Sequence, residues 1–403
     1  MRESRPLVPM ISLARYAELF SQPEMRRAII ASFIGRLPIG ISGLALLLLV
    51  QANESSVSEA GLVTSAYLGG LAAIAPLVGR MIDRLGPRPV LLASGVAYPL
   101  VLLILVGAVT QQASLGLVLA LSFGAGATLP QITTCMRTLY RRRLQDDALL
   151  VAALSFDSVL IEIVFICGPM LVAFVVATAT PDLAVLLGAL CAAVGAVLVT
   201  RTPAMTAWPI ERSPQSSPLG VLRDRGFRQL LAILLGYAAV FGCVDIGVAT
   251  YAFEAQRPAL AGVILGVMSI GSAAGGLAYG GRSWHLPLTQ QFPMALLVMG
   301  FSIAPLAMIS NPFLLALAAV VSGITMAPPL IIQSTMVAKT MPTSRMAEAF
   351  TWVTTAMLCG VGIGFACGGL VAEALGAAAV FLLATCITVV MGFAARGILG
   401  SAG

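Results

Sequence analysis

Twelve apolar stretches, each long enough to cross a lipid bilayer, constrain this chain of 403 residues more than any other feature. A transmembrane helix needs about 20 predominantly apolar residues. In lipid, every backbone N–H and C=O group must be paired inside the segment, so these stretches are expected to be helical. Their predicted bounds are 28–51, 60–78, 90–109, 115–136, 148–177, 183–200, 229–253, 259–280, 289–309, 312–338, 347–372 and 377–395. The predicted fold class is an all-α membrane protein with twelve transmembrane helices.

The composition agrees with this class and disfavours catalysis. Only 10% of the residues are charged, whereas soluble domains carry about 25%. The seven cysteines and the one histidine form no CxxC or His pair, so neither a metal site nor a cofactor is expected. No G-x-S-x-G sequence and no nucleotide-binding motif is present. We therefore expect neither an enzyme nor a pump that hydrolyses ATP.

The loops between the spans divide the chain into two halves. Most are short, but residues 201–228 form a longer stretch with several Pro and Ser residues, as is typical of a linker. The prediction is a six-helix bundle in residues 1–200, a cytoplasmic linker in 201–228 and a second six-helix bundle in 229–403.

The positive charges predict the orientation, because cytoplasmic loops retain Lys and Arg. If both termini are cytoplasmic, all of the 23 Lys and Arg residues except Arg36 and Arg257 lie in cytoplasmic segments. The formal net charge of +6 then reflects loops that face anionic lipid, and no nucleic-acid partner is needed to explain it.

One of these cytoplasmic loops, GRMIDRLGPRPVLL at residues 79–92, carries a recognisable pattern. It resembles the loop signature G-x-x-x-D-R-x-G-R-R/K of the major facilitator superfamily, with matches at Gly79, Asp83, Arg84, Gly86 and Arg88. The resemblance implies a secondary transporter whose two six-helix bundles surround a central cavity. Without it, the loop would be interpreted as a solvated segment that only fixes topology.

The resemblance also implies a gating role for this loop. Asp83 would accept hydrogen bonds at the N-terminus of span 347–372 when the cytoplasmic side is closed, where the helix dipole also favours an anion. Gly79 and Gly86 allow tight turns and close approach, and the two arginines of the signature supply charge-assisted donors. Arg137, at the end of span 115–136, is a plausible second partner of the gate, although it can equally be a topology signal.

A second, partial resemblance concerns the direction of transport. Gly168 and Pro169 match the core of the antiporter signature G-x8-G-x3-G-P-x2-G-G, while its other glycine positions hold Ser155, Val164, Val172 and Ala173. Close helix packing in lipid is the alternative explanation for the glycine.

Four charged residues lie inside the spans, where an ionised side chain costs about 2.5–3.5 kcal/mol on insertion scales. They are Arg36, Asp157, Glu162 and Asp245. At a rise of 1.5 Å per residue, the first two lie at about the same depth and the other two roughly 7 Å further outward. A structural pair of Arg36 with Asp157 or Glu162 is one interpretation, and proton coupling or substrate contact by the remaining acids is the other. Asp157 is the better partner for Arg36, which leaves Glu162 and Asp245 as candidate proton carriers. Glu162 is the first choice, because it lies six residues before Gly168 and Pro169, where a helix irregularity would change its exposure.

The expected function is secondary active transport of a small organic molecule by alternating access, coupled to protons and directed outward. Uptake of an anionic metabolite, with Arg36 as a carboxylate clamp, is a second hypothesis. A membrane sensor or scaffold that transports nothing is a third. The expected setting is a bacterial cytoplasmic membrane, with the protein as a monomer.

The first prediction concerns orientation. Single cysteines introduced as Leu85→Cys and Ala113→Cys in a cysteine-free background should differ in labelling by a membrane-impermeant maleimide added outside the cell. Cysteine 113 should react and cysteine 85 should be protected, because only the first faces outward. The reverse pattern would invert the topology.

Overall fold

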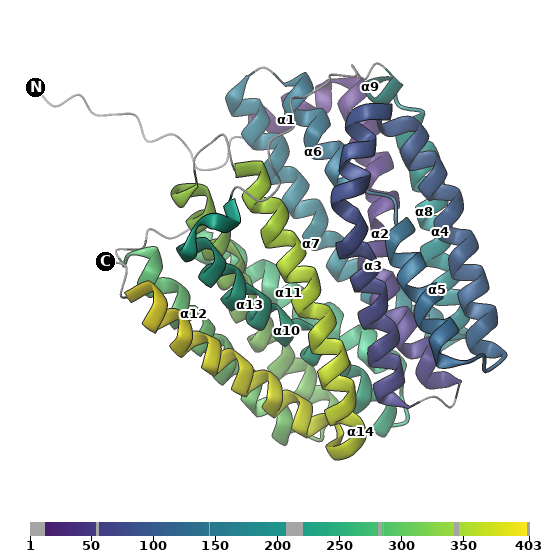
Figure 1. Cartoon of the computed structure of the whole chain (residues 1–403), viewed down its shortest axis with the longest axis vertical. Coiled ribbons are helices and arrows are strands. Elements are labelled where there is room, and N and C mark those ends of the chain that lie inside the picture. Colours follow the sequence, from purple (N-terminus) through teal and green to yellow (C-terminus); the bar gives the residue numbers. More distant parts are fainter. Residues whose placement is uncertain are drawn as a thin grey trace, which may run out of the picture.

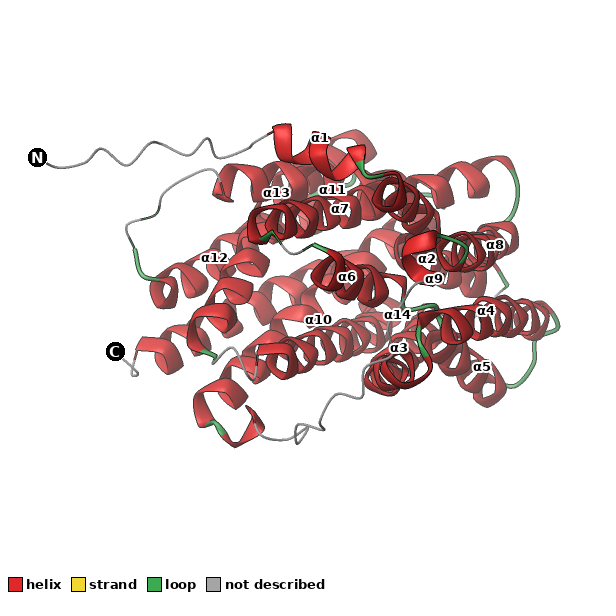
Figure 2. Cartoon of the chain, turned by 90° about the horizontal axis from the view of Figure 1, so that it is seen from above, coloured by secondary structure: helices red, strands yellow, loops and turns green. Residues whose placement is uncertain are grey.

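The structure, a computed structural model, describes residues 13–53, 56–144, 146–206, 221–280, 284, 286–341 and 346–400. Within these ranges all regular structure is helical and no strand occurs. The helices form one elongated bundle (Figure 1), and a view from above shows many of them nearly end-on (Figure 2). The predicted all-α class is confirmed.

The predicted spans coincide with these helices. In the first half they are α2 (Pro23–Ala52), α3 (Val57–Leu85), α4 (Pro87–Thr110), α5 (Leu115–Thr128) with α6 (Ile132–Arg143), α7 (Asp147–Thr178) and α8 (Pro181–Thr200). In the second half they are α10 (Arg225–Glu254), α11 (Ala259–Gly280), α12 (Leu288–Ile303) with the 3-10 helix η2 (Ala304–Met308), α13 (Pro312–Thr340) and α14 (Met346–Gly400). The short helices α1 (Leu13–Ser21), α9 (Pro203–Thr206) and η1 (Val221–Arg223) lie outside the spans.

Two residues break the simple pattern of one helix per span. Pro130 lies in the gap between α5 and α6. Proline lacks the backbone N–H that donates the hydrogen bond of a continuous helix, which favours a break at this position. Gly376, with φ of 77°, divides α14 into two stretches. A straight helix of 55 residues would be roughly 80 Å long, far more than a bilayer core of about 30 Å. Eleven helices of the described chain are long and apolar enough to span a membrane. One of them, α14, is divided at Gly376 and is long enough for two crossings.

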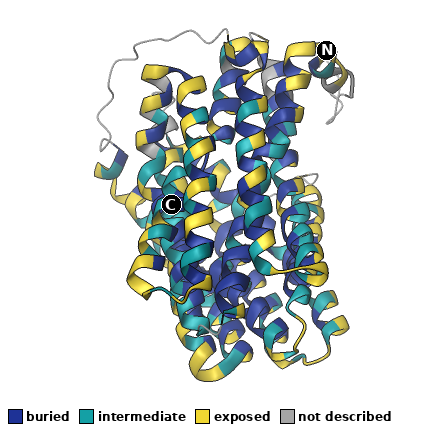
Figure 3. Ribbon diagram, turned by 90° about the vertical axis from the view of Figure 1, so that its right-hand side faces the viewer, coloured by how far each residue is buried: buried dark blue, intermediate teal, exposed yellow. Residues whose placement is uncertain are grey.

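The outer surface of the bundle is apolar, as lipid contact requires. Phe174, Leu103 and Phe301 are more than half exposed. Buried residues lie mainly on the faces where helices meet (Figure 3). Since lipid tails are as apolar as leucine, burying such side chains gives little drive for helix association, and close packing has to supply it.

Glycines provide that packing within the first half. A Cβ on Gly195 of α8 would lie 2.1 Å from the Cα of Gly35 on α2, and one on Gly168 of α7 would lie 2.5 Å from the carbonyl carbon of Gly40. A Cβ on Gly126 of α5 would lie 1.8 Å from the carbonyl oxygen of Tyr67 on α3. These backbones approach so closely that no side chain fits between them.

Contacts between the two halves are concentrated at one end of the bundle. We call it the distal end; it includes Asn53, Ser56, the loop at 255–258 and the bend at Gly376, and lies opposite the end where the described chain begins and stops. There α3 packs on the first stretch of α14, and α7 packs on α11. Toward the other, terminal end, α10, α12 and the second stretch of α14 run obliquely away from the helices of the first half (Figure 1). The division at residues 200 and 229 stays a prediction, since residues 207–220 of the linker lie outside the described ranges.

The glycine contact between α2 and α8 gives the second prediction. Gly195→Val should lower the apparent melting temperature of the purified protein by several degrees, because overpacking a tight contact costs about 1–3 kcal/mol. Gly107→Val is the matched control, since nothing lies within 4 Å of a Cβ at that helical glycine. Equal melting temperatures for the two variants would contradict the role of this contact.

Candidate functional site

Three charged side chains of the first half, from α2, α6 and α7, meet in one group. Arg36 of α2 donates from Nη2 to Oδ1 of Asp157 on α7 at 2.5 Å. Arg137 of α6 donates from Nε to Oδ2 of the same carboxylate at 3.0 Å. The side chains of Arg36 and Asp157 are fully buried, whereas that of Arg137 is 49% exposed. The pairing of Arg36 with Asp157 expected from their equal depth is therefore present in the structure.

The break at Pro130 helps to position this group. Because α5 ends at Thr128 and α6 restarts at Ile132, Arg137 lies on a separate short helix whose Ile132 packs against Gly35, next to Arg36. Two arginines on one carboxylate leave a formal charge of +1. Nε and Nη1 of Arg36 have no hydrogen-bond partner among the described residues, nor has the buried hydroxyl of Tyr140, which is close to all three charged groups. The group thus has unused donors.

Glu162 lies on the side of α7 that faces the other half. It precedes Ile166, Pro169 and Met170 by four, seven and eight residues, so all four share one helical face. That face contacts α11: Gly262 lies against the carbonyl of Pro169, and Gly266 against Met170 and Ile166. Glu162 is one to two turns closer to the terminal end than this contact, and is half-buried with no hydrogen bond or ion pair to a described residue. It therefore lies where the halves begin to separate.

Asp245 lies on α10, a helix of the second half that also contacts the first half. Tyr237 of α10 packs on Phe292 of α12, Gly242 lies against α14, and Gly247 lies against Phe381. α2 of the first half is among the helices that contact α10, and Ile246, the residue after Asp245, lies against Gly61 of α3. Within the described chain its carboxylate has no hydrogen bond or ion pair, and the residue is only partly exposed.

The helix irregularity expected at Gly168 and Pro169 is absent, which corrects the sequence interpretation. The α7 helix runs unbroken from Asp147 to Thr178. Gly168 is needed for contact with Gly40, and the carbonyl of Pro169 lies against Gly262. Close packing on both sides keeps the helix regular, so a change in the exposure of Glu162 has to come from movement of the halves.

The signature residues lie at the terminal end, where α3 ends and α4 begins. Gly86 has φ of 81° and joins the two helices, a conformation that favours glycine. Arg84 and Arg88 are exposed, and a Cβ on Gly79 would meet nothing within 4 Å, so the close approach expected there does not occur in this conformation. Asp83 is in the last turn of α3, but its side chain lies outside the described residues, so its contact with α14 stays a prediction.

The distal end has a polar contact that the sequence interpretation missed. Glu373, near the end of the first stretch of α14, accepts at Oε2 from the backbone N–H of Ser58 at 3.3 Å. Ser58 is in the first turn of α3, where Ser56 and Glu59 form a capping box. The S-x-x-E spacing of residues 56–59 was the available signal for that helix start. Glu373 thus binds the N-terminus of α3 much as Asp83 is expected to bind the N-terminus of α14.

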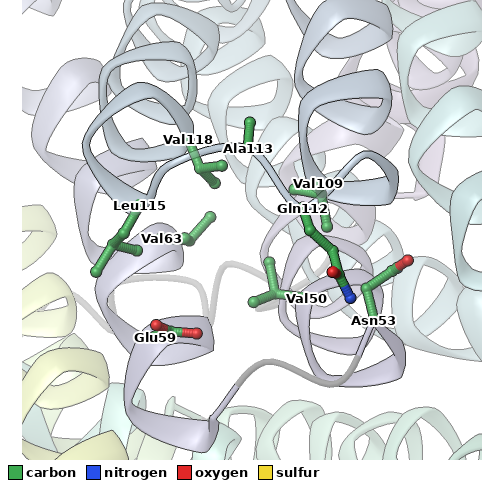
Figure 4. Close-up of a pocket in the computed structure, with 9 residues that line it drawn as sticks. All are labelled: Val50, Asn53, Glu59, Val63, Val109, Gln112, Ala113, Leu115 and Val118. Carbon is green, nitrogen blue, oxygen red and sulfur yellow. The ribbon is translucent and has the colours of Figure 1, made fainter.

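A cavity of about 240 Å³ lies near this end but inside the first half (Figure 4). It is lined by Val50, Asn53, Glu59, Val63, Val109, Gln112, Ala113, Leu115 and Val118. Its one acid, Glu59, is held in the capping box, and no residue of the second half lines the cavity. It is therefore not on a path between the halves.

The described residues contain no group of three or more His, Cys, Asp and Glu side chains able to hold a metal ion. What the geometry offers is a cationic group inside the first half and two acids close to contacts between the halves. Proton transfer or binding of an anion is the chemistry available to such groups.

Comparisons with known proteins agree with this architecture. Two crystal structures of the nucleoside transporter NupG superimpose on the chain. The structure of a point mutant gives a TM-score of 0.76 at 16% sequence identity and covers 92% of this chain and 99% of the other. The structure of NupG itself gives a TM-score of 0.72 at 17% identity and covers 93% of this chain and 98% of the other. The human organic anion transporter MFSD10 (TETRAN) superimposes with 0.66 at 19%, covering 93% and 99%. At these identities the likeness shows the fold. No curated protein sequence matched the chain.

The family model described as Major Facilitator Superfamily matches residues 28–285, more than half of the sequence. This match and the transporter structures favour a transporter over an enzyme. The chain is thus a multi-pass membrane protein that belongs to the major facilitator superfamily.

Proposed function

We propose that this protein is a proton-coupled secondary transporter that moves a small organic molecule across a bacterial cytoplasmic membrane by alternating access, acting as a monomer. The observation that carries the proposal is the position of Glu162 and Asp245, two acids that lie close to contacts between the halves and have no partner among the described residues. An unpaired carboxylate in a membrane is costly and is usually retained for function.

The contacts between the halves support the alternating-access part. They run along α3 with α14 and α7 with α11, they lie at the distal end, and they consist largely of glycines against backbone. If both termini are cytoplasmic, the distal end faces outward and this conformation is open toward the cytoplasm. Rocking of one half against the other would then open the distal seam and close the terminal end, where Asp83 would meet the start of α14.

The charge arrangement supports proton coupling. Both carboxylate oxygens of Asp157 are paired, one with Arg36 and the other with Arg137. Glu162 and Asp245 lack such compensation among the described residues. Each can therefore bind a proton from one side and release it to the other as the halves move. The direction we propose is efflux, on the resemblance of Gly168 and Pro169 to the antiporter signature.

Uptake of an anionic molecule is a second candidate function, favoured by the unused donors of Arg36. Its Nε and Nη1 are without partners among the described residues, and the group that contains it is cationic. The carboxylate of a substrate could take the place of Asp157 on the half-exposed Arg137, or could bind the Arg137 guanidinium together with Asp157. The solved organic anion transporter is in keeping with such a substrate.

The third prediction tests the proposed function. In proteoliposomes with an imposed pH gradient, a panel of a labelled nucleoside, a sugar, a carboxylate and a cationic dye should contain at least one compound that the protein accumulates. Glu162→Gln or Asp245→Asn should abolish accumulation of that compound while exchange without a gradient continues, because the proton site is lost and the binding site is not. Glu24→Gln, an exposed acid in the first turn of α2, is the control.

The coupling assignment fails if both variants retain full gradient-driven accumulation. Asp157 would then be the remaining buried acid. If no compound of any class is transported, the result favours the hypothesis of a sensor or scaffold that transports nothing.

The fourth prediction concerns the two ends of the bundle. Asp83→Asn weakens a charge-assisted contact worth about 1.5–3 kcal/mol at the terminal end, and Glu373→Gln weakens its counterpart at the distal end. The two changes should shift the conformational balance in opposite directions. Ser65→Cys, in the seam between α3 and α14, should therefore react more slowly with an external maleimide in the first variant and faster in the second. Shifts of the same sign would contradict the reciprocal arrangement.

A further inference from the structure

A groove on the outside of the first half has features that transport does not use. α2 and α8 touch at Gly35 and Gly195, and from there toward the terminal end a groove of about 400 Å³ separates them. The helices on which α8 packs, namely α2, α4, α7 and α9, all belong to its own half, so α8 lies on the outside of the bundle. The groove beside it therefore opens to the surrounding lipid.

The part of the groove nearest the glycine contact is apolar. Ile30 and Leu198 line it and are 58% and 39% exposed, with Ile34 and Ala31 between them. Ile30 and Ile34 are one helical turn apart on α2, so they form a continuous apolar strip. Such a strip suits an acyl chain and offers nothing to a free anion.

The other part of the groove is cationic. Arg27 from the first turns of α2 and Arg201 from the end of α8 line it, and both are exposed. Neither guanidinium has a hydrogen bond or ion pair with any residue in the described ranges. Two unpaired arginines at the rim of a lipid-facing groove are complementary to a phosphate.

We propose that this groove binds an anionic phospholipid, with its phosphate between Arg27 and Arg201 and one acyl chain along Ile30, Ile34 and Leu198. Basic pockets between transmembrane helices are suited to such headgroups. The bound lipid would bridge α2 and α8 at the level where their glycine contact ends.

Native mass spectrometry of the full chain in detergent, with added phosphatidylglycerol or phosphatidylcholine, tests the proposal. Phosphatidylglycerol should be retained and phosphatidylcholine should not. Arg27→Gln with Arg201→Gln should weaken phosphatidylglycerol retention about 30-fold, which corresponds to about 1 kcal/mol for each arginine. Arg26→Gln with Arg225→Gln removes the same charge from exposed positions outside the groove and should leave retention unchanged.

Two further arms separate a lipid from a free phosphate. Ile30→Asn, an exposed position, should also reduce phosphatidylglycerol retention, because the acyl chain loses its apolar strip. Excess inorganic phosphate should not displace the lipid. Equal retention in the groove and control variants, equal retention of the two lipids, displacement by phosphate, or no effect of Ile30→Asn would each overturn the proposal.

Discussion

The structure depends on helices approaching until their backbones touch. In lipid, burying apolar side chains gives little advantage, so helix association has to come from close contacts and polar bonds. Gly35 with Gly195, and Gly40 with Gly168, join α2 to α8 and α7 inside the first half. The contacts between the halves are of the same kind but run along two seams at the distal end. Glycine contacts of this kind hold the two halves together, and our proposal requires one half to rotate on the other along these seams.

The acidic residues inside the membrane-spanning helices have two different environments. Asp157 has both oxygens bound by arginines from two other helices, so it joins α2, α6 and α7 into one unit. Removing one partner from such a buried pair costs about 3–5 kcal/mol, which makes this carboxylate a structural element. Glu162 and Asp245 differ from it because they lie at the junction of the halves without a partner among the described residues. We therefore assign a structural role to Asp157 and propose proton transfer only for the other two acids.

Much of the fold could be predicted from the sequence, because a bilayer leaves helices as the available structure for a span of about 20 apolar residues. The Arg36–Asp157 pair could be predicted as well, since depth follows directly from residue spacing along a helix. What the sequence did not reveal depends on rotation and three-dimensional approach. It did not show that Arg137 reaches Asp157, because this requires the break at Pro130. It did not show that Glu373 meets Ser58, since these residues are 315 positions apart. The helix irregularity expected at Gly168 and Pro169 is absent, because packing against α2 and α11 keeps α7 continuous.

The central claim is that the α3–α14 seam opens during each transport cycle. It can be tested most directly by locking that seam: a Cβ on Gly362 would lie 3.4 Å from Oγ of Ser65, close enough for a disulfide between Ser65→Cys and Gly362→Cys in a cysteine-free protein. The account predicts that the cross-link forms readily, that it abolishes transport in proteoliposomes, and that a reductant restores transport, while each single cysteine variant stays active under oxidation. Full transport by the cross-linked protein would contradict it.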